Sequence, residues 1–366
     1  MSEDREANFI VGIFGEVESQ NNLIGQTLGS PGTRSDIQFY NKLDINNNQV
    51  FCVLTPIDYP EKIKPFLQTL AMTNIHILVV DLNYDLKAIA GEILIGMDLY
   101  HQLYQTHTLV VITGIDAKNE WKLAATVKKV NSILNSSSLG GTEVLIVKNK
   151  EDLELLKNKI SKFNDSVQIS KDNSSKYSKV LIDHVFPVKG IGTVILGIVN
   201  KGEIHAGQML ELTGNESIGK KVIIRSIQKH DRNFKDAFIG DRVGIALKGN
   251  ITPNEISRDH VLATQGILKP IKKFKAQVFL NQYYAPKEGK LIPGNGVQYH
   301  GIVDLKISPF KFIEGKELSP GESGIMTLEF IKNIYSDGAP ITGIITELNR
   351  FNNKLRIVGH YTQILN

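Results

Sequence analysis

The first half of the chain alternates short apolar runs with longer helical patterns, and this alternation restricts the fold more than any other feature. The apolar runs predict β-strands at residues 9–14, 50–54, 75–81, 108–113 and 143–147. Helices are predicted at 61–73, 85–104, 119–135 and 151–163, and a further helix is expected to begin after Asn22. Strands that alternate with helices form largely parallel sheets. Residues 1–165 are therefore predicted to form an α/β domain.

The pattern changes at Lys179, after a polar segment at 166–178 whose Ser and Lys content predicts a linker. From Lys179 onward, short β-rich runs are separated by turns that contain Gly. Such a series is typical of antiparallel barrels or sandwiches. A second break at Thr264–Phe274 divides this half into 179–266 and 267–366, each long enough for a small barrel. The predicted fold class is α/β followed by all-β, with one α/β domain and two β-barrel domains.

The composition is that of an ordinary globular protein. The 366 residues are 42% hydrophobic and 22% charged, and the longest apolar runs are too short to span a bilayer. The polar N-terminal residues do not resemble a secretory signal, so we expect a cytoplasmic protein without membrane contact. Cys52 is the only cysteine, which excludes an intramolecular disulfide and a Cys metal cluster. Cys52 and the only tryptophan, Trp121, have apolar neighbours in the sequence and are expected in the core.

Charge is distributed unevenly along the chain. Residues 1–175 contain 16 Lys and Arg against 21 Asp and Glu, a net charge of −5. Residues 176–366 contain 26 against 17, a net charge of +9, and the two values give the overall +4. A basic half suits contact with a polyanion, although a solvated surface of mixed sign would give the same totals.

Two motifs in the first predicted barrel are specific enough to indicate a family. The run "GIGTVILGIVNKGEIHAG", Gly190–Gly207, has glycines at strand ends and turns, where positive φ or close strand approach favours them. The run "GDRVGIALKG", Gly240–Gly249, follows it. Both resemble motifs of the second domain of translation GTPases, the family of elongation factor Tu and SelB. "NEISRDHVLAT", Asn254–Thr264, is similar to the segment that closes that domain. The resemblance implies a GTPase-like α/β domain followed by two barrels, as in elongation factor Tu.

The resemblance also implies a phosphate loop after the first strand, with the form Gly, four residues, Gly-Lys and then Ser or Thr. When the count starts at Gly15, the second Gly falls on Gln20, the Lys on Asn21 and the hydroxyl residue on Asn22. None of the three required residues is present. The phosphate loop is therefore predicted to be degenerate.

The residues that would bind magnesium and position the attacking water in the implied site also differ from those of the family. The family has an Asp that reaches magnesium after the second conserved strand, and this chain has Thr55 there, with Asp58 near the Gly position. The His that positions the attacking water corresponds to Tyr59. "TRSDIQFYN", Thr33–Asn41, is expected to take the place of the long first switch loop.

The base-reading motifs are incomplete. The guanine-reading motif corresponds to "TGID", Thr113–Asp116, in which Asp116 remains but Gly114 stands in place of Lys. The Ser-Ala pair of the last motif is replaced by Val147 and Lys148. Asp116 could still read guanine, or it could be an ordinary helix cap or turn residue.

These losses predict that the domain no longer binds GTP. A triphosphate brings about four negative charges, which the family neutralises with the loop Lys, magnesium and backbone N–H groups. Here the loop contains Glu16 and Glu18 instead, which would repel phosphate. A hydrogen bond to a charged group contributes roughly 1.5–3 kcal/mol. Losing the Lys and the metal together should therefore weaken GTP affinity by several orders of magnitude. We expect no hydrolysis, no catalytic residue, no cofactor and no metal site. A vestigial nucleotide site is left at Gly15, Asn21, Asn22 and Asp116.

The family holds aminoacyl-tRNA with its two barrels and approaches the ribosome, so the resemblance implies these partners. The pocket for the tRNA 3′ end would lie within 190–264, with Glu255 and Arg258 beside it. RNA phosphates would be neutralised by the lysines that open the last domain, Lys269, Lys272, Lys273 and Lys275. Lysines also occur on solvated edge strands, where they discourage aggregation, so this alternative stays open.

The whole chain is similar to archaeal SelB-like paralogues of elongation factor Tu, one of which has been proposed as a factor for pyrrolysine tRNA. "GTRSDIQFYN", Gly32–Asn41, resembles a run found in that branch. The implied function is a translation factor that binds aminoacyl-tRNA or the ribosome, but not DNA, and that is not an enzyme. Two alternatives stay open. The chain could be a working GTPase that holds GTP and magnesium with an unorthodox loop, or a protein-interaction adaptor of the translation machinery.

Overall fold

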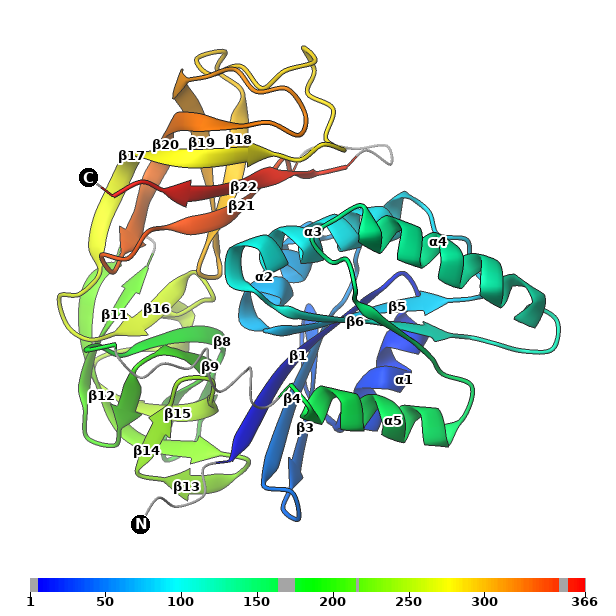
Figure 1. The fold of residues 1–366 in the computed structure, drawn as a ribbon. Helices are drawn as coiled ribbons and strands as arrows, with labels where there is room; N and C mark the ends of the chain where they lie inside the picture. The colour runs from blue at the N-terminus through cyan, green and yellow to red at the C-terminus, as the bar shows by residue number, and fades with distance from the viewer. Residues whose placement is uncertain (1–5, 164–174, 215–216, 349–354, 366) are drawn as a thin grey trace. The chain divides into compact units, whose positions relative to one another are not determined.

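A computed structural model of the chain describes residues 6–163, 175–214, 217–348 and 355–365. Within these ranges the chain forms two compact units, an α/β unit over residues 6–163 and an all-β unit that begins at residue 175 (Figure 1). The predicted linker at 166–178 lies mostly outside the described residues. No helix in the described ranges is long and apolar enough to cross a membrane.

The α/β unit is built on one seven-stranded sheet. Its strands are β1 (Ala7–Gly15), β2 (Ser30–Arg34), β3 (Ile37–Asp44), β4 (Gln49–Pro56), β5 (Ile75–Asp81), β6 (His107–Thr113) and β7 (Glu143–Ile146). Its helices are α1 (Glu18–Leu28), α2 (Ile63–Met72), α3 (Ala88–Tyr104), the short 3₁₀ helix η1 (Glu120–Lys122), α4 (Leu123–Asn135) and α5 (Lys150–Ser161).

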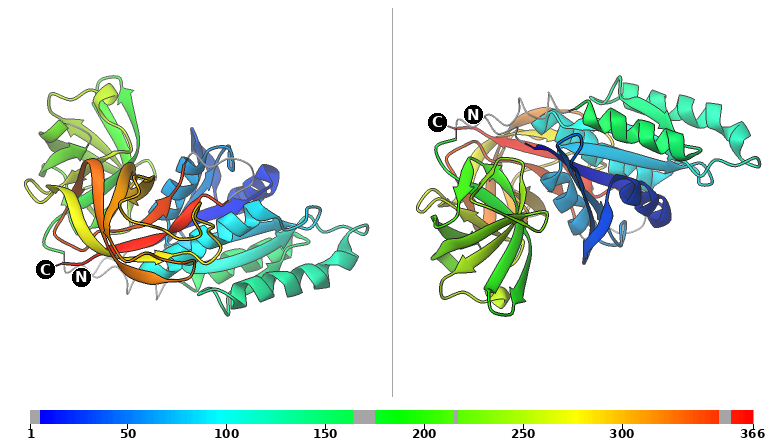
Figure 2. Two further views of the ribbon diagram at one scale, coloured as in Figure 1. Left: turned by 90° about the horizontal axis from the view of Figure 1, so that it is seen from above. Right: turned by 90° about the horizontal axis from the view of Figure 1, so that it is seen from below.

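The strand order is β2-β3-β4-β1-β5-β6-β7. Strands β4, β1, β5, β6 and β7 run parallel, whereas β3 pairs in antiparallel fashion with both β2 and β4. Helices α1 and α5 cover one face of the sheet, and α2 and α3 cover the other (Figure 1). When the molecule is seen from below, α1 and α5 lie on the near side of the sheet (Figure 2). The predicted largely parallel sheet flanked by helices is confirmed.

The central strands are buried on both faces. All seven residues of β5 are buried, as a parallel strand between two helical layers requires. In β1, Phe9 stacks on Phe51 of β4 with ring centroids 5.1 Å apart, and Phe14 packs edge-on against Phe66 of α2. Because the strands are parallel, the carboxyl ends of β1, β4, β5 and β6 meet at one edge of the sheet. Ligands of open α/β sheets bind at that edge, so it is the first place to look for a site.

Helix α1 begins earlier than the sequence predicted. It starts at Glu18 rather than after Asn22, so Gln20 and Asn21 lie in its first turn and not in a loop. The chain lacks the glycines that would keep this stretch open, and the carboxylate of Glu18 favours a helix N-terminus. The segment Thr33–Asn41 forms parts of strands β2 and β3 in place of a long loop.

Cys52 is buried as expected, but the expectation of a buried tryptophan was wrong. Trp121 is 77% exposed. It lies in η1, where its indole Nε1 donates a hydrogen bond to the carbonyl of Lys118 at 3.0 Å. The apolar residues next to it in the sequence, Leu123 and Ala124, are not fully buried either. Local apolar composition was therefore a poor guide to burial at this end of α4.

The first barrel of the all-β unit contains a seven-stranded sheet with the order β11-β16-β8-β9-β15-β12-β13. Strand β11 also pairs with β12, which closes the barrel. The strands are β8 (Lys179–Val188), β9 (Gly192–Lys201), β11 (Met209–Gly214), β12 (Ser217–Lys229), β13 (Arg232–Phe234), β15 (Arg242–Lys248) and β16 (His260–Ala263). A short separate pair is formed by β10 (Glu203–His205) and β14 (Asp236–Phe238), and the 3₁₀ helix η2 (Pro253–Glu255) precedes β16.

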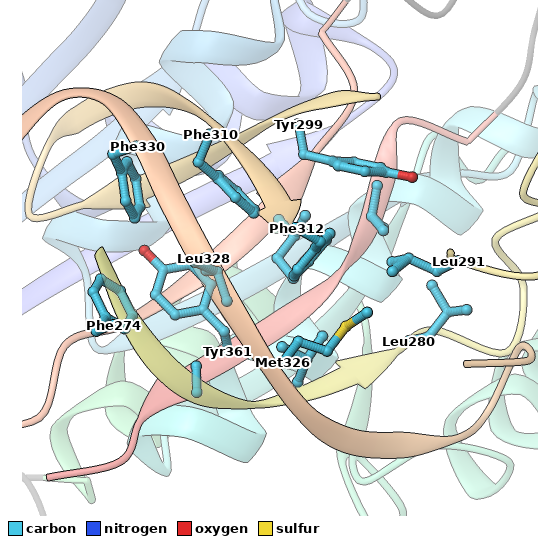
Figure 3. Packing of buried hydrophobic residues seen from close by; sticks show 14 of the residues in the cluster. Phe274, Leu280, Leu291, Tyr299, Phe310, Phe312, Met326, Leu328, Phe330 and Tyr361 are labelled. Carbon is cyan, nitrogen blue, oxygen red and sulfur yellow. The ribbon is translucent and has the colours of Figure 1, made fainter. Parts of the chain in front are cut away.

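The second barrel is closed, with the order β17-β20-β19-β18-β21-β22. Its strands are β17 (Lys269–Leu280), β18 (Gln298–Val303), β19 (Lys306–Gly315), β20 (Ser323–Ser336), β21 (Thr342–Thr346) and β22 (Ile357–Gln363). Aromatic rings fill its interior, and Figure 3 shows Phe274, Phe310, Phe330 and Tyr361 among them. The prediction of two small barrels after an α/β domain is confirmed.

Buried charges join the two barrels. Lys179 of β8 is 6% exposed, and its Nζ lies 2.7 Å from Oδ1 of Asp304 and 3.4 Å from Oδ2 of Asp337, both in the second barrel. Lys201 of β9 also reaches Asp337, at 3.0 Å. A buried cation needs such partners, because an unpaired charge in this position would be strongly destabilising.

Candidate functional site

The side chain of Asn21 fills the space at the end of β1 where a phosphate loop was expected. Its Nδ2 donates a hydrogen bond to the carbonyl of Gly15 at 3.0 Å, and the residue is 4% exposed. Packing is tight, since a Cβ placed on Gly15 would lie 2.5 Å from Oδ1 of Asn21 and 2.7 Å from the carbonyl oxygen of Val79. Asn22 is also engaged, because its Oδ1 accepts a hydrogen bond from the hydroxyl of Tyr40 at 2.6 Å. Both predicted loop residues are therefore used in packing.

Carboxylates surround the neighbouring space. Glu16 follows β1 directly, and its Oε1 accepts a hydrogen bond from the backbone nitrogen of Ala90 at 3.0 Å, in the first turn of α3. A carboxylate is stabilising at a helix N-terminus. Beside it lies a cavity of about 20 Å³ that Asp81 and Asp85 also line. This volume holds roughly one water molecule. The edge of the sheet thus offers a small and acidic space.

The residues at the positions implied for magnesium and the attacking water, Thr55, Asp58 and Tyr59, are buried or paired with other residues of the α/β unit. Thr55 is 2% exposed at the end of β4. Tyr59, which the resemblance implies takes the place of the water-positioning His, donates a hydrogen bond from its hydroxyl to Oε2 of Glu92 at 2.8 Å. Asp58 pairs with Lys62 at 2.7 Å. Across the described ranges, no group of three or more His, Cys, Asp and Glu side chains is arranged to hold a metal ion.

The turn after β6 is built around a glycine. Gly114 has φ +68°, and a Cβ placed on it would overlap the carboxylate of Asp81. Asp116 is exposed, and its Oδ1 accepts hydrogen bonds from the backbone nitrogens of Lys118 at 2.7 Å and Asn119 at 3.0 Å. This is the pattern of an Asp that closes a turn. Gly15, Asn21 and Asn22 lie together, whereas Asp116 follows β6, which β5 separates from β1.

The first barrel carries a groove largely within the region predicted to hold a pocket, but the cations that line it were not among the predicted site residues. It is an open groove of about 1000 Å³ between the β8–β9 turn, β12 and the end of β15. Its charged lining residues are three exposed cations, Lys189, Arg225 and Lys248. The apolar lining consists of Pro187, Val188, Ile191, Leu247, Ile251 and Pro253. Cations beside an apolar surface suit a nucleotide, because phosphate and base require different surroundings. The three cations are far apart in the sequence, so only the barrel brings them together.

The two residues predicted beside a tRNA pocket both have partners within the first barrel. Glu255 contacts Lys220, and its Oε2 accepts a hydrogen bond from the backbone nitrogen of Thr252 at 2.8 Å. The hydrogen bond with Lys220, followed by those with Thr252, lowers the pKa of Glu255 to about 2. Arg258 donates from Nε to the carbonyl of Asp183 at 2.9 Å. Glu255 borders the groove, because Thr252 is one of the lining residues.

The four lysines predicted for RNA contact, Lys269, Lys272, Lys273 and Lys275, all lie on β17 and are exposed. Strand β17 belongs to a closed barrel, so part of its length has a neighbouring strand on each side. Its first half nevertheless pairs only with β20, because pairing with β22 begins at Ala276. The edge-strand explanation therefore applies to the segment that carries the lysines, and their role in RNA contact stays a prediction.

The sequence of the first barrel matches a known family. Residues 192–255 match the model of elongation factor Tu domain 2. An uncharacterized protein of Methanocaldococcus jannaschii is 30% identical over 282 residues, which cover 76% of this chain and 80% of that protein. The selenocysteine-specific elongation factor of the same organism is 34% identical over 219 residues. That alignment covers 58% of this chain and 45% of the factor, so the chain matches less than half of its length.

Solved structures show the same fold. Translation elongation factor SelB from Methanococcus maripaludis, in complex with the GTP analogue GppNHp, superposes with a TM-score of 0.77 at 22% identity. The match covers 99% of this chain and 80% of that one. A bacterial selenocysteine-specific elongation factor, EF-Sec, superposes with a TM-score of 0.79 at 18% identity, over 97% of this chain and 58% of that one. The structures show the shared fold, and the domain 2 match together with the sequence relatives shows that the chain belongs to the elongation factor Tu and SelB-like family.

Proposed function

We propose that this chain is a translation factor that binds aminoacyl-tRNA or the ribosome through its barrels, with an α/β domain that has lost GTP binding and hydrolysis. The observation that carries the proposal is the contact of Asn21 with Gly15. A neutral amide takes the position of the phosphate-binding lysine and closes the space at the end of β1. The domain then acts as a fixed scaffold and not as a switch.

Electrostatics support the nucleotide half of the proposal. A magnesium-bound triphosphate needs cations and aligned N–H groups in one place. Glu16, Asp81 and Asp85 line the neighbouring cavity instead, and its volume of about 20 Å³ is far below that of a triphosphate. Thr55 provides no carboxylate on the magnesium side. The residues present at this edge do not fit GTP with magnesium.

The groove of the first barrel supports the RNA half. Lys189, Arg225 and Lys248 line it without a carboxylate among the described lining residues. Each RNA phosphate that they neutralise would release counterions, so binding should weaken as the salt concentration rises. The net charge of +9 over residues 176–366 favours the same class of partner.

Calorimetric titration with GTP and magnesium tests the nucleotide half. We expect no binding heat at micromolar concentrations, both for the natural chain and for Asn21→Ala, which opens space without adding a cation. Submicromolar affinity that Asn21→Ala abolishes would overturn the proposal and support a working GTPase with an unorthodox loop.

Titration of labelled tRNA across a salt series tests the RNA half. The triple variant Lys189→Gln, Arg225→Gln, Lys248→Gln should bind more weakly, and its logarithmic salt slope should be shallower by roughly 0.7–0.9 for each phosphate that is no longer neutralised. A matched triple variant replaces three exposed lysines of the α/β unit, Lys62, Lys64 and Lys87, and should bind like the natural chain. If tRNA does not bind, or if its affinity does not change with salt, the proposed RNA binding is wrong. A protein partner that stays bound in a pull-down after nuclease treatment would then favour the adaptor alternative.

A further inference from the structure

An apolar groove adjoins a free sheet edge in the α/β unit. Strand β7 is the last strand of the sheet, and no described strand pairs with its outer side. Residues of α4 and of β7 together line an open groove of about 970 Å³, which we call the α4–β7 groove. Its apolar lining residues are Leu123, Ala124, Val127 and Ile146. Ile146 is 39% exposed although it belongs to a strand. Through Ile146, the groove therefore reaches the free edge of the sheet.

The two edges of this sheet are protected unequally. Strand β2, at the opposite edge, contains Pro31 and Arg34, and its pairing with β3 is irregular between these two residues. Proline, charge and irregular pairing all hinder the addition of another strand. Strand β7 has the sequence Glu-Val-Leu-Ile, and its one charge, Glu143, is already paired with Lys159 at 2.7 Å. The edge at β7 is thus the one at which an added strand meets no such barrier.

The charge around the groove is positive. Lys128 lines the groove, and Lys122 immediately precedes α4. Neither lysine has an ion-pair partner in the described part of the chain, whereas Glu120 and Glu143 are both neutralised by lysines. The remaining lining residues are uncharged, namely Asn131, Ser132, Asn135 and Ser136. An occupant with acidic side chains would complement this surface.

Trp121 lies in η1, immediately before the helix that lines the groove. It precedes Leu123 by two residues, is 77% exposed, and has the Nζ of Lys122 5.6 Å from its ring centroid. The hydrogen bond from its Nε1 to Lys118 holds the ring at the surface. Large exposed aromatic residues are enriched where proteins meet partners.

We propose that the α4–β7 groove docks an extended, acidic segment of a partner protein, which adds a strand to β7. Backbone hydrogen bonds to the free edge would supply affinity, and alternate apolar side chains would enter the groove beside Val127 and Ile146. Acidic residues near the ends of the segment would lie within reach of Lys122 and Lys128. This inference is independent of the proposed role of the barrels.

A synthetic peptide of about eight residues tests the proposal, since a typical strand has this length or less. In the peptide, Val and Ile alternate with Thr, and Glu occupies both ends. Trp121 is the only tryptophan of the chain and lies two residues before the lining residue Leu123, so its fluorescence can report on binding at this end of the groove. We expect a saturable blue shift with the acidic peptide, and about tenfold weaker binding at low salt for a peptide with Lys at both ends.

Three variants make the test specific. Ile146→Lys places on the edge a residue that discourages strand addition and should abolish the shift. Lys128→Glu should reduce or reverse the difference in affinity between the acidic peptide and the peptide with Lys at both ends. Ile45→Lys is the matched control, because Ile45 is 79% exposed in the β3–β4 turn and its replacement should change nothing.

Several results would overturn the proposal. They are the absence of a shift with the acidic peptide, an unchanged peptide preference in Lys128→Glu, and equal effects of Ile45→Lys and Ile146→Lys. Sedimentation gives a further check. A dimer of the natural chain that Ile146→Lys dissociates would show that a second copy, and not a partner protein, covers the edge.

Discussion

Gly114 and Asp81 lie so close together that a Cβ on the glycine would overlap Oδ1 of the aspartate. Asp81 ends β5, and Gly114 follows the adjacent strand β6. The same carboxylate oxygen accepts a hydrogen bond from the backbone nitrogen of Asn83 at 2.9 Å, which fixes its position. The family resemblance implies that Gly114 takes the position of the lysine in the guanine-reading motif. Any side chain at this position, a lysine included, would overlap Asp81 and strain the turn.

Replacement of Gly114 should be costly for this reason. We expect Gly114→Ala to lower the free energy of unfolding of the α/β unit by about 2–4 kcal/mol, of which the left-handed backbone alone accounts for about 1–3 kcal/mol. Gly91→Ala is the matched control, because a Cβ there meets nothing within 4 Å and the residue lies in α3. It should stabilise the unit by about 0.5–1 kcal/mol. Urea unfolding followed by helical circular dichroism measures both, since every described α-helix belongs to this unit. Equal stability of the two variants would contradict the rigid-turn interpretation.

His76 should make the α/β unit sensitive to mild acid. It is fully buried in β5, and burial lowers its pKa to about 4. Because the unfolded chain binds the proton with a pKa near 6.5, protonation favours unfolding. The stabilising contribution is complete above pH 6.5 and is lost as the pH falls towards 4, with a total change of up to about 3 kcal/mol.

The variant His76→Leu should remove this pH dependence from urea unfolding of the helices. His205→Gln is the control, because His205 lies on β10 of the other unit, where the hydrogen bond with Asp236 raises its pKa. That contribution has the opposite sign, being present at low pH and lost as the pH rises. An unchanged acid profile in His76→Leu would show that another group governs the transition.

The order of domains was predictable because each class of structure leaves its own period in the sequence. Residues 75–81 were predicted as a strand and form β5 with the same bounds. The start of α1 was not predicted, since the expected loop came from the family motif and not from the residues, which permit a helix from Glu18. Trp121 was misplaced because apolar neighbours do not reveal which side of a helix faces the core.

For the candidate nucleotide site, the sequence alone could indicate only which residues of the family motif are missing. Counting positions predicts that Asn21 stands in place of the phosphate-binding lysine, and this stays a prediction. Counting positions could not predict that the Asn21 side chain fills this space, because its hydrogen bond to the carbonyl of Gly15 depends on the early start of α1. The cationic lining of the groove in the first barrel could not be predicted from the sequence, for a similar reason. Arg225 and Lys248 come from strands β12 and β15, and only strand pairing places them on one surface.

Asp337 should control the stability of the all-β unit in stronger acid. Burial alone would raise its pKa, but the charge of Lys179 and the hydrogen bond from Lys201 outweigh burial and lower the pKa to about 2. The stabilising contribution is therefore present above the unfolded pKa near 3.9 and is lost as the pH falls through about 2.

We expect Asp337→Asn to destabilise the all-β unit by about 2 kcal/mol near neutral pH, because Asp304 is then the one charged partner left to Lys179 among the described residues. The loss of stability between about pH 4 and pH 2 should become shallower. Glu317→Gln serves as the control, since Glu317 forms an exposed pair with Lys290 at 3.6 Å. Scanning calorimetry across this pH range measures both variants. If the two variants behave alike, the junction between the barrels does not depend on Asp337.

Glu255 offers a test of how the first barrel meets RNA. Its carboxylate neutralises Lys220 beside a groove whose other charges are positive. Glu255→Gln removes the negative charge and frees Lys220, while the amide oxygen can still accept the hydrogen bond from Thr252. We therefore expect tRNA affinity to rise by roughly threefold to tenfold at low salt, and the gain to vanish at high salt. The same substitution at Glu317, on the second barrel, should leave affinity unchanged. A fall in affinity for Glu255→Gln would show instead that Glu255 touches the RNA directly, as the family resemblance implies.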